Sequence, residues 1–513
     1  MKKKSLILCS ATALLGVSAL SGCAGLQSSN TLVVWVGSES VEYYRDLAKT
    51  FLNDNPEFGY KISIIGADTG SAGGQMVADN GACGDIVTIA HDNIGKLSQS
   101  SYIAPIVGSA AEGKALLDQI NADNPEGFKK AIKNMLGTDH PEYTYTFAVP
   151  YISQALFLYY DTRYITDAEA DTFEGLEQAA ARYDKDHGVS GTKSYTVTGT
   201  DGFNFSFSLL HRNISGGNTS TLRLYEGGKR SDAYCQSNEQ VAVMKWMQRS
   251  YASNNGCMLG SDSPWATNIE QHKALSVIGG AWHYESFKKA VTDSNGKVNM
   301  GCKIIPQFTL TAQDVEGIQQ VNYPNDAGLP AELRGKVDPV PAVGTVFRGG
   351  SFVDCKCFVI NMAKMTGPEK YYKMCDLLRY FSTKQVQNES FLKCLNVPAY
   401  AGAEAYIEEV KDKVDHTAYL MASSQTGMST YGIPQPFVDG TLNQLYYSMS
   451  APDQYVQCVK KSQDSTSGKI IGGDVQGIRE VLFKMEYIWK WGNPPAKTSM
   501  PTDFPHQTTD RIQ

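Results

Sequence analysis

Near its N-terminus the chain alternates strand and helix patterns, and this alternation most constrains what it can fold into. Residues 31–36 (TLVVWV) form a continuous apolar run, typical of a parallel strand buried on both faces. Apolar residues between Val41 and Phe51 recur at helical spacing and predict one buried helix face. Residues 60–65 and 85–89 predict two more strands. This order indicates an α/β fold with an open, mainly parallel sheet and right-handed crossovers.

Acidic residues follow two of these expected strands. Glu39 comes after the first strand, and Asp92 comes after the strand at 85–89. Ligands of open α/β sheets bind beyond the carboxyl ends of the strands, so both carboxylates are candidates for ligand contact. Aspartate is also favoured as a helix N-cap, which leaves a purely structural alternative for Asp92. We expect His91 to support the turn rather than to bind a ligand.

The middle of the chain repeats the strand pattern less regularly. Residues 148–160 predict a long extended stretch, and residues 276–282 and 301–306 predict short strands. Residues 307–347 are rich in Gly, Pro, Asn and Asp, and we interpret them as a long excursion.

Two amphipathic helices and a polar tail are expected toward the C-terminus. Thr366-Gly-Pro-Glu369 predicts a capping box at the start of one helix. Apolar residues from Val475 to Trp489 predict the last helix. Residues 491–513 contain four prolines and are expected to form a loose tail.

Residues 1–22 have the features of an export signal. Three lysines at positions 2–4 precede an apolar run of about 15 residues, shorter than the roughly 20 that a membrane-spanning helix needs. Cys23 follows Leu-Ser-Gly, an order that resembles a bacterial lipobox, so we expect Cys23 to be lipidated. Residues 23–30 would then be the anchor and a polar linker. The alternative is an ordinary signal peptide with an incidental cysteine.

Charge and cysteine content limit the possible partners of the chain and the roles of its cysteines. The net charge is −7 and no Lys/Arg cluster lies beyond the signal, so we expect no nucleic-acid partner. Nine of the 11 cysteines lie outside the signal and the anchor, and an odd number cannot all pair. We interpret most of them as small core residues, with any disulfides left open. Cys355 and Cys357 are expected to diverge on a strand, and no cofactor or metal motif accompanies them.

Six segments, in order, resemble the maltose-binding group of bacterial extracellular solute-binding lipoproteins, which serve ABC sugar importers. The strongest are residues 85–95 with 97–106, residues 148–160, and Val277-Ile-Gly-Gly-Ala-Trp282. Weaker similarities lie at residues 34–36, at 350–352 with Lys356, and at 433–435. Each segment alone has little specificity, but the ordered set spans nearly the whole chain.

The resemblance implies two α/β lobes joined by three hinge crossings, with a ligand held between them. Residues 31–152 and 305–382 would form the first lobe, and residues 153–304 and 383–490 the second. Crossings are expected near residues 153–154, 304–305 and 382–383. Ligand would shift an open–closed equilibrium, and the implied partners are a carbohydrate, the permease subunits and a membrane, reached through the lipid anchor. The implied oligomeric state is a monomer.

The resemblance also implies a set of ligand contacts. Trp282 would stack on a sugar ring, with core packing as the alternative, and Gln154 stands where the family has a glutamate. Ile89, Asn93 and Ala281 depart from the family pattern, so the sugar is not assigned. The full set of candidate ligand-binding residues is Glu39, Asp92, Asn93, Gln154, Phe203, Trp282, Tyr446 and Tyr447.

Two other functions remain open at this stage. A glycoside hydrolase would need two carboxylates about 5 to 9.5 Å apart, and Glu39 with Asp92 is the available pair. No nucleophile elbow, His-Glu-x-x-His motif or phosphate loop accompanies them, and we expect no enzyme activity. A surface receptor that feeds a sensor kinase would use the same cleft. The leading expectation is a lipid-anchored carbohydrate-binding protein on the extracellular face of the cell membrane.

Overall fold

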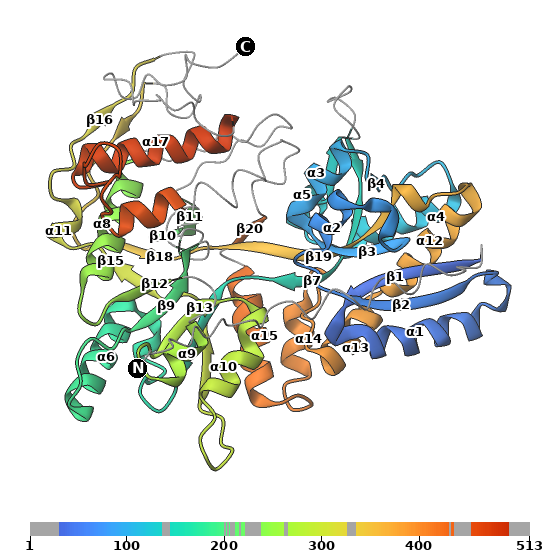
Figure 1. Cartoon of the computed structure of the whole chain (residues 1–513), viewed down its shortest axis with the longest axis horizontal. Helices are drawn as coiled ribbons and strands as arrows, with labels where there is room; N and C mark the ends of the chain where they lie inside the picture. The colour runs from blue at the N-terminus through green and yellow to red at the C-terminus, as the bar shows by residue number, and fades with distance from the viewer. Residues whose placement is uncertain are drawn as a thin grey trace, which may run out of the picture.

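The computed structural model forms two groups of elements, joined by the long strands β7 (Ala148–Gln154) and β19 (Ser351–Asn361) (Figure 1). It describes residues 30–135, 144–199, 202, 205, 211–214, 217–220, 237–260, 265–325, 335–429, 432–434 and 453–491. The expected signal peptide, Cys23 and all of the tail beyond residue 491 lie outside this range. We call the group that contains the N-terminal strands the first lobe and the other the second lobe.

The first lobe is built on the strands that the sequence predicts. β1 (Thr31–Gly37) lies between β2 (Lys61–Ala67) and β3 (Ile86–Ala90), and all three are parallel. β19 pairs with β3 in antiparallel fashion and with β7 along its other edge. Two short strands complete this sheet by pairing with the two ends of β19: β4 (Ile103–Ala104) and β20 (Gly432–Pro434). The sheet is therefore mixed, with a parallel part at the N-terminal strands.

Helix α1 (Val41–Asp54) shows how the first lobe acquires its core. Its apolar stripe buries Tyr44, Leu47 and Phe51, as the periodicity predicts. The Tyr44 ring meets Tyr151 of β7 and Phe358 of β19, and those two rings stack with centroids 4.2 Å apart. The other helices of this lobe are α2 (Ala72–Ala78), α3 (Ile94–Gln99), α4 (Ala111–Asp123), α5 (Glu126–Ala131), α12 (Pro368–Phe381) and α13 (Lys384–Cys394).

The second lobe has a five-stranded sheet in the order β12-β9-β13-β8-β14. The strands β12, β9 and β13 run parallel, whereas β8 is antiparallel to both β13 and β14. The bounds of the five strands are β8 (Phe157–Asp161), β9 (Tyr195–Thr198), β12 (Cys257–Gly260), β13 (Ser276–Gly279) and β14 (Met300–Lys303). The helices of this lobe are α6 (Phe173–His187), α8 (Asn238–Ala252), α9 (Trp265–Glu270), α10 (Tyr284–Ala290), α14 (Ala403–Glu409), α15 (His416–Ser429) and α17 (Val475–Trp491).

The expected excursion at 307–347 contains regular structure and belongs to the second lobe. Phe308, Leu310 and Phe347 are buried in the core of that lobe. A four-stranded sheet brings this segment together with an earlier part of the chain, in the order β11-β10-β18-β15. The elements concerned are β10 (His211–Ile214), β11 (Gly217–Ser220), β15 (Gln307–Thr309), α11 (Ala312–Val315), β16 (Val321–Asn322), β17 (Val337–Asp338) and β18 (Val346–Arg348). A separate two-stranded pair, β5 (Lys133–Met135) and β6 (Thr144–Thr146), lies in the first lobe.

The described part of the chain passes between the lobes at several points, and two of the expected positions differ from those observed. The first connection follows β7. The second lies just before β19, not near residue 305, because the segment after Pro306 remains in the second lobe's sheets. The third lies within α13, whose Val386 is in the first core and whose Phe391 is in the second, a few residues after the expected position near residue 382.

Two local expectations are wrong. Helix α12 begins after Gly367 with Pro368 in its first turn and has no side-chain cap, so Thr366 and Glu369 form no capping box. Cys355 and Cys357 do not diverge: their Sγ atoms lie 3.3 Å apart, because residues two apart on a strand share a face. Among the described residues all cysteines are free, and all except Cys394 are buried, which confirms the interpretation of most as core residues.

Candidate functional site

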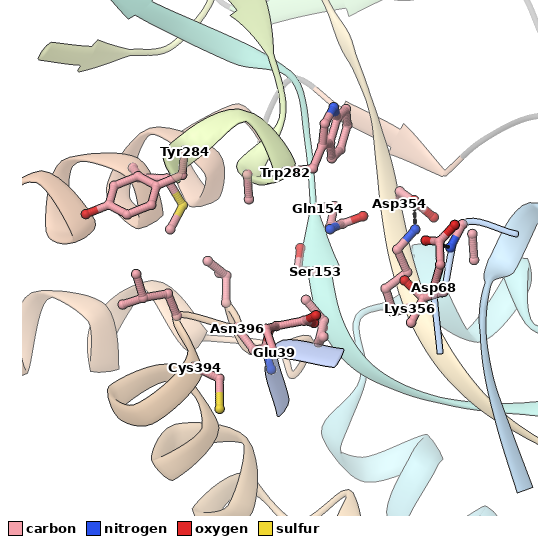
Figure 2. Close-up of a pocket in the computed structure, with 18 of the residues that line it drawn as sticks. Glu39, Asp68, Ser153, Gln154, Trp282, Tyr284, Asp354, Lys356, Cys394 and Asn396 are labelled. Atoms are coloured by element: carbon pink, nitrogen blue, oxygen red, sulfur yellow. Dashed lines mark hydrogen bonds and ion pairs between the residues drawn. The ribbon is translucent and has the colours of Figure 1, made fainter. Parts of the chain in front are cut away.

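A cavity of about 710 Å³ lies between the two lobes and is the candidate site. The strand β7 passes through it and carries Ser153 and Gln154 (Figure 2). In this view Trp282 of the second lobe lies beside the upper part of β7, and Glu39 of the first lobe lies beside its lower part. Any ligand held here would contact both lobes at once.

The first-lobe wall is formed by the turns that follow β1 and β3. Glu39 lies on the short 3-10 turn at Ser38–Ser40, directly after β1, and is exposed to the cavity. Asp92 and Asn93 lie on the turn at His91–Asn93, after β3. The Asn93 amide donates a 2.7 Å hydrogen bond to Asp92. Asp92 caps no helix, since the residue before α3 is Asn93 and no side-chain cap is formed, so the N-cap alternative for Asp92 is wrong.

A charged cluster supports this wall from behind. His91 is fully buried, and its Nδ1 contacts Asp354 and lies 3.1 Å from the backbone nitrogen of Cys355. The Lys356 ammonium lies 3.5 Å from the other oxygen of Asp354. His91 therefore ties the turn to β19, which is the supporting role that the sequence predicts.

The two carboxylates of this region have opposite pKa shifts. Burial, together with the nearby charge of Asp354, raises the pKa of Asp92 above its ordinary value. Burial opposes ionisation of Asp354 too, but the charges of Lys356 and His91 outweigh it and lower the pKa of Asp354. Burial alone would lower the pKa of Lys356, yet Asp354 and Asp92 together raise it. Asp354 and Lys356 therefore form a fixed ion pair. The nearby negative charge of Asp354 makes ionisation of Asp92 less favourable.

Strand β7 forms the floor of the cavity and is held firmly at Ser153. The Ser153 amide donates to the Val397 carbonyl at 2.8 Å, and the Ser153 carbonyl accepts from Gln425 at 2.6 Å. The next residue, Gln154, has a side-chain oxygen that is buried and has no hydrogen-bond partner. An unsatisfied acceptor of this kind is costly unless a ligand donates to it.

Trp282 comes from a short 3-10 turn, Ala281–His283, that directly follows β13. It is 45% exposed, although large aromatic side chains are usually buried, so core packing does not explain it. A Cβ on Gly280 would overlap the indole ring, which lies back across that glycine. The neighbouring His283 is buried against Trp265, with ring centroids 4.4 Å apart, and burial lowers the pKa of His283 to about 4.

The structure brings the described candidates together. Glu39, Asp92, Asn93, Gln154 and Trp282 all line the one cavity. Phe203, Tyr446 and Tyr447 lie outside the described residues.

The lining also includes polar residues that were not predicted as ligand contacts, among them Asp68, Glu285, Asp354 and Asn396. Asp68 follows β2, so the rule for strand ends could have found it. The position of Asn396, whose amide donates to Ser40 and Ser390 at 2.9 Å, depends on contacts far apart in the sequence.

Two further features of the described residues concern membranes and metal ions. No helix among them has the length and apolar character that crossing a membrane requires. No group of three or more His, Cys, Asp and Glu side chains within the same ranges could hold a metal ion.

Comparison with known proteins identifies relatives of the fold. The family model described as bacterial extracellular solute-binding protein matches residues 46–418. No curated protein matches the chain significantly. Among solved structures, a ligand-free maltodextrin-binding protein from L. casei BL23 is similar with a TM-score of 0.60 and 15% identity, over 90% of this chain and 99% of the other. A maltose-binding periplasmic protein from Listeria monocytogenes, in complex with maltose, is similar with a TM-score of 0.58 and 16% identity, over 89% and 97%.

Proposed function

Because the chain belongs to the family of bacterial extracellular solute-binding proteins, we propose that it captures a carbohydrate between its lobes and delivers it to an ABC permease. An oligosaccharide such as a maltodextrin fits the proposal. The observation that carries it is the cavity at the lobe junction, with the exposed Trp282 on one wall and Glu39 and Asp92 on the other. An aromatic face suits the apolar side of a pyranose, and carboxylates suit its hydroxyl groups.

The proposal includes a lipid anchor at Cys23, based on the Leu-Ser-Gly-Cys order and the short apolar run before it. Each buried methylene contributes about 0.8 kcal/mol, and stable anchoring takes about two acyl chains. Residues 24–30 would link the anchor to β1. A monomer tethered in this way would stay near its permease on the extracellular face of the membrane.

One observation favours a second candidate, a glycoside hydrolase. Glycosidases use two carboxyl groups whose pKa values are separated, one as the acid and one as the base or nucleophile. Asp92 and Asp354 show that separation. However, Asp354 is engaged by His91 and Lys356, which leaves little of it to attack or to activate water. We therefore keep hydrolysis as the alternative that the experiment must exclude.

Small-angle X-ray scattering with and without a bound oligosaccharide tests the binding mechanism. Closure of the lobes should reduce the radius of gyration, and binding should raise the melting temperature by mass action. Chromatography of the recovered ligand tests the chemistry, and the sugar should come back intact after long incubation. Cleaved products at enzyme-like rates would support the hydrolase instead. An unchanged scattering curve at saturation would refute lobe closure alone.

A further inference from the structure

Two of the side-chain amides that line the cavity, Asn93 and Asn396, already donate their hydrogens within the protein. The Asn93 amide nitrogen donates to Asp92 at 2.7 Å and to the Ala90 carbonyl at 3.4 Å. The Asn396 amide nitrogen donates to two serine hydroxyls, each at 2.9 Å. Each of these nitrogens has two hydrogens, so neither retains one for a ligand.

In contrast, several hydrogen-bond acceptors that line the cavity have no partner or have free capacity. The Gln154 side-chain oxygen is buried without a partner. Three lining carboxylates, Glu39, Asp68 and Glu285, take part in none of the ion pairs found among the described residues. Asp68 accepts one hydrogen bond, from the backbone of Gly70 at 3.0 Å, which leaves most of its capacity free. A ligand in the cavity therefore meets several acceptors that have no partner or have free capacity, and three of them are carboxylates.

The charged groups that line the cavity are mostly negative. Five carboxylates line the cavity, and the only ammonium among its described lining residues is that of Lys356, which is paired with Asp354. The raised pKa of Asp92 reflects this crowding of negative charge, in addition to burial. A positive group that entered the cavity would relieve this repulsion, whereas a neutral group would leave it.

We propose that the cavity prefers an oligosaccharide that carries protonated amines, of the glucosamine type, over a neutral oligosaccharide of equal length. This inference rests on the proposed carbohydrate function and names its substrate class. An ammonium brings three donors, no acceptor and a positive charge, and so complements free carboxylates and the Gln154 oxygen. The exposed face of Trp282 serves either form, because it accepts a sugar face or a cation.

Isothermal titration with three trisaccharides tests the inference: the glucosamine trimer, its neutral N-acetylated form and maltotriose. We expect the glucosamine trimer to bind at least about tenfold more tightly than both neutral trimers. That advantage should shrink when salt is raised from about 50 to about 500 mM, and it should vanish above the pKa of the sugar amine. Equal or tighter binding of a neutral trimer would overturn the inference and leave the carbohydrate function standing. Binding of no sugar would overturn both.

Charge-removing variants make the test specific to the cavity. Asp68→Asn and Glu285→Gln keep the shape of the side chain, and each should weaken the glucosamine trimer by about three- to tenfold and weaken neutral trimers by less. Glu404→Gln, on the exposed surface of α14, removes the same charge outside the cavity and is the matched control. Equal losses in the cavity variants and the control would show a general effect of net charge and would overturn the assignment to this site.

Discussion

A substitution at Gly280 can displace the Trp282 indole ring without removing it. The backbone of Gly280 has φ −99° and ψ −173°, a conformation that alanine adopts freely. In Gly280→Ala the new Cβ would overlap the indole ring, so the ring must turn away. Because the ring is 45% exposed, its displacement should lower the free energy of unfolding by only about 0.5 kcal/mol. The melting temperature should then fall by about 1 to 2 °C.

Ligand binding should suffer much more than stability. Truncation of an aromatic hot spot costs about 2 kcal/mol or more, and displacing the ring should cost about 1 to 2 kcal/mol. The dissociation constant should therefore rise about 5- to 30-fold. Titration calorimetry measures this change, and tryptophan fluorescence reports whether the indole has moved.

A double-mutant cycle separates the ring from the backbone as the cause. In a Trp282→Ala background the added methyl has nothing to displace, so Gly280→Ala should then have little further effect. Gly260→Ala, at a strand end where no neighbour obstructs a Cβ, controls for the substitution itself. Unchanged affinity despite a moved indole, or full additivity with Trp282→Ala, would refute the role of Trp282 as the sugar platform.

Three further predictions follow from other parts of the chain. Cys23→Ala should release the protein from the membrane fraction or leave its precursor uncut, and membrane fractionation identical to that of the parent would refute the anchor. Burial holds the pKa of His283 at about 4, so below about pH 6.5 the unfolded state binds more protons than the folded state. The free energy of unfolding should therefore fall by about 2 kcal/mol between pH 7 and pH 4.5. Urea titrations of the parent and of His283→Asn check this, and an equal fall in both proteins would contradict it. Asp92→Ala should weaken sugar binding by about 1 to 3 kcal/mol in calorimetry, and an unchanged dissociation constant would remove Asp92 from the site.

The sequence predicts the N-terminal strands of the first lobe and the residues that follow them, for a physical reason. A strand buried on both faces must be apolar throughout, so residues 31–36 could be recognised without any partner. Glu39 and Asp92 could be placed together because the carboxyl ends of parallel strands meet at one edge. Each of these inferences uses only local pattern and one rule of topology.

The connections between the lobes, and the β19 residues behind the first-lobe wall of the site, could not be predicted from local sequence patterns. Pro306 looks like the end of a lobe, but the following strand β15 finds its partner β18 about forty residues later. Lys356 and Asp354 of β19 are brought to the turn after β3 only by a long-range strand pairing. Asn396 is fixed by Ser40, which lies near the other end of the chain.

The place of β19 in the first lobe bears on when this chain can fold during synthesis. β1, β2, β3 and β7 are complete once residue 154 has been made, but β19, which lies between β3 and β7, ends at Asn361. At translation rates of about 5 to 20 residues per second, the earlier strands wait roughly 10 to 40 s for it. Until then one edge of β3 and one edge of β7 have no native partner, so the sheet of the first lobe cannot be completed. Under the proposed export of this chain, the delay would give the export machinery time to engage a polypeptide whose first-lobe sheet is incomplete.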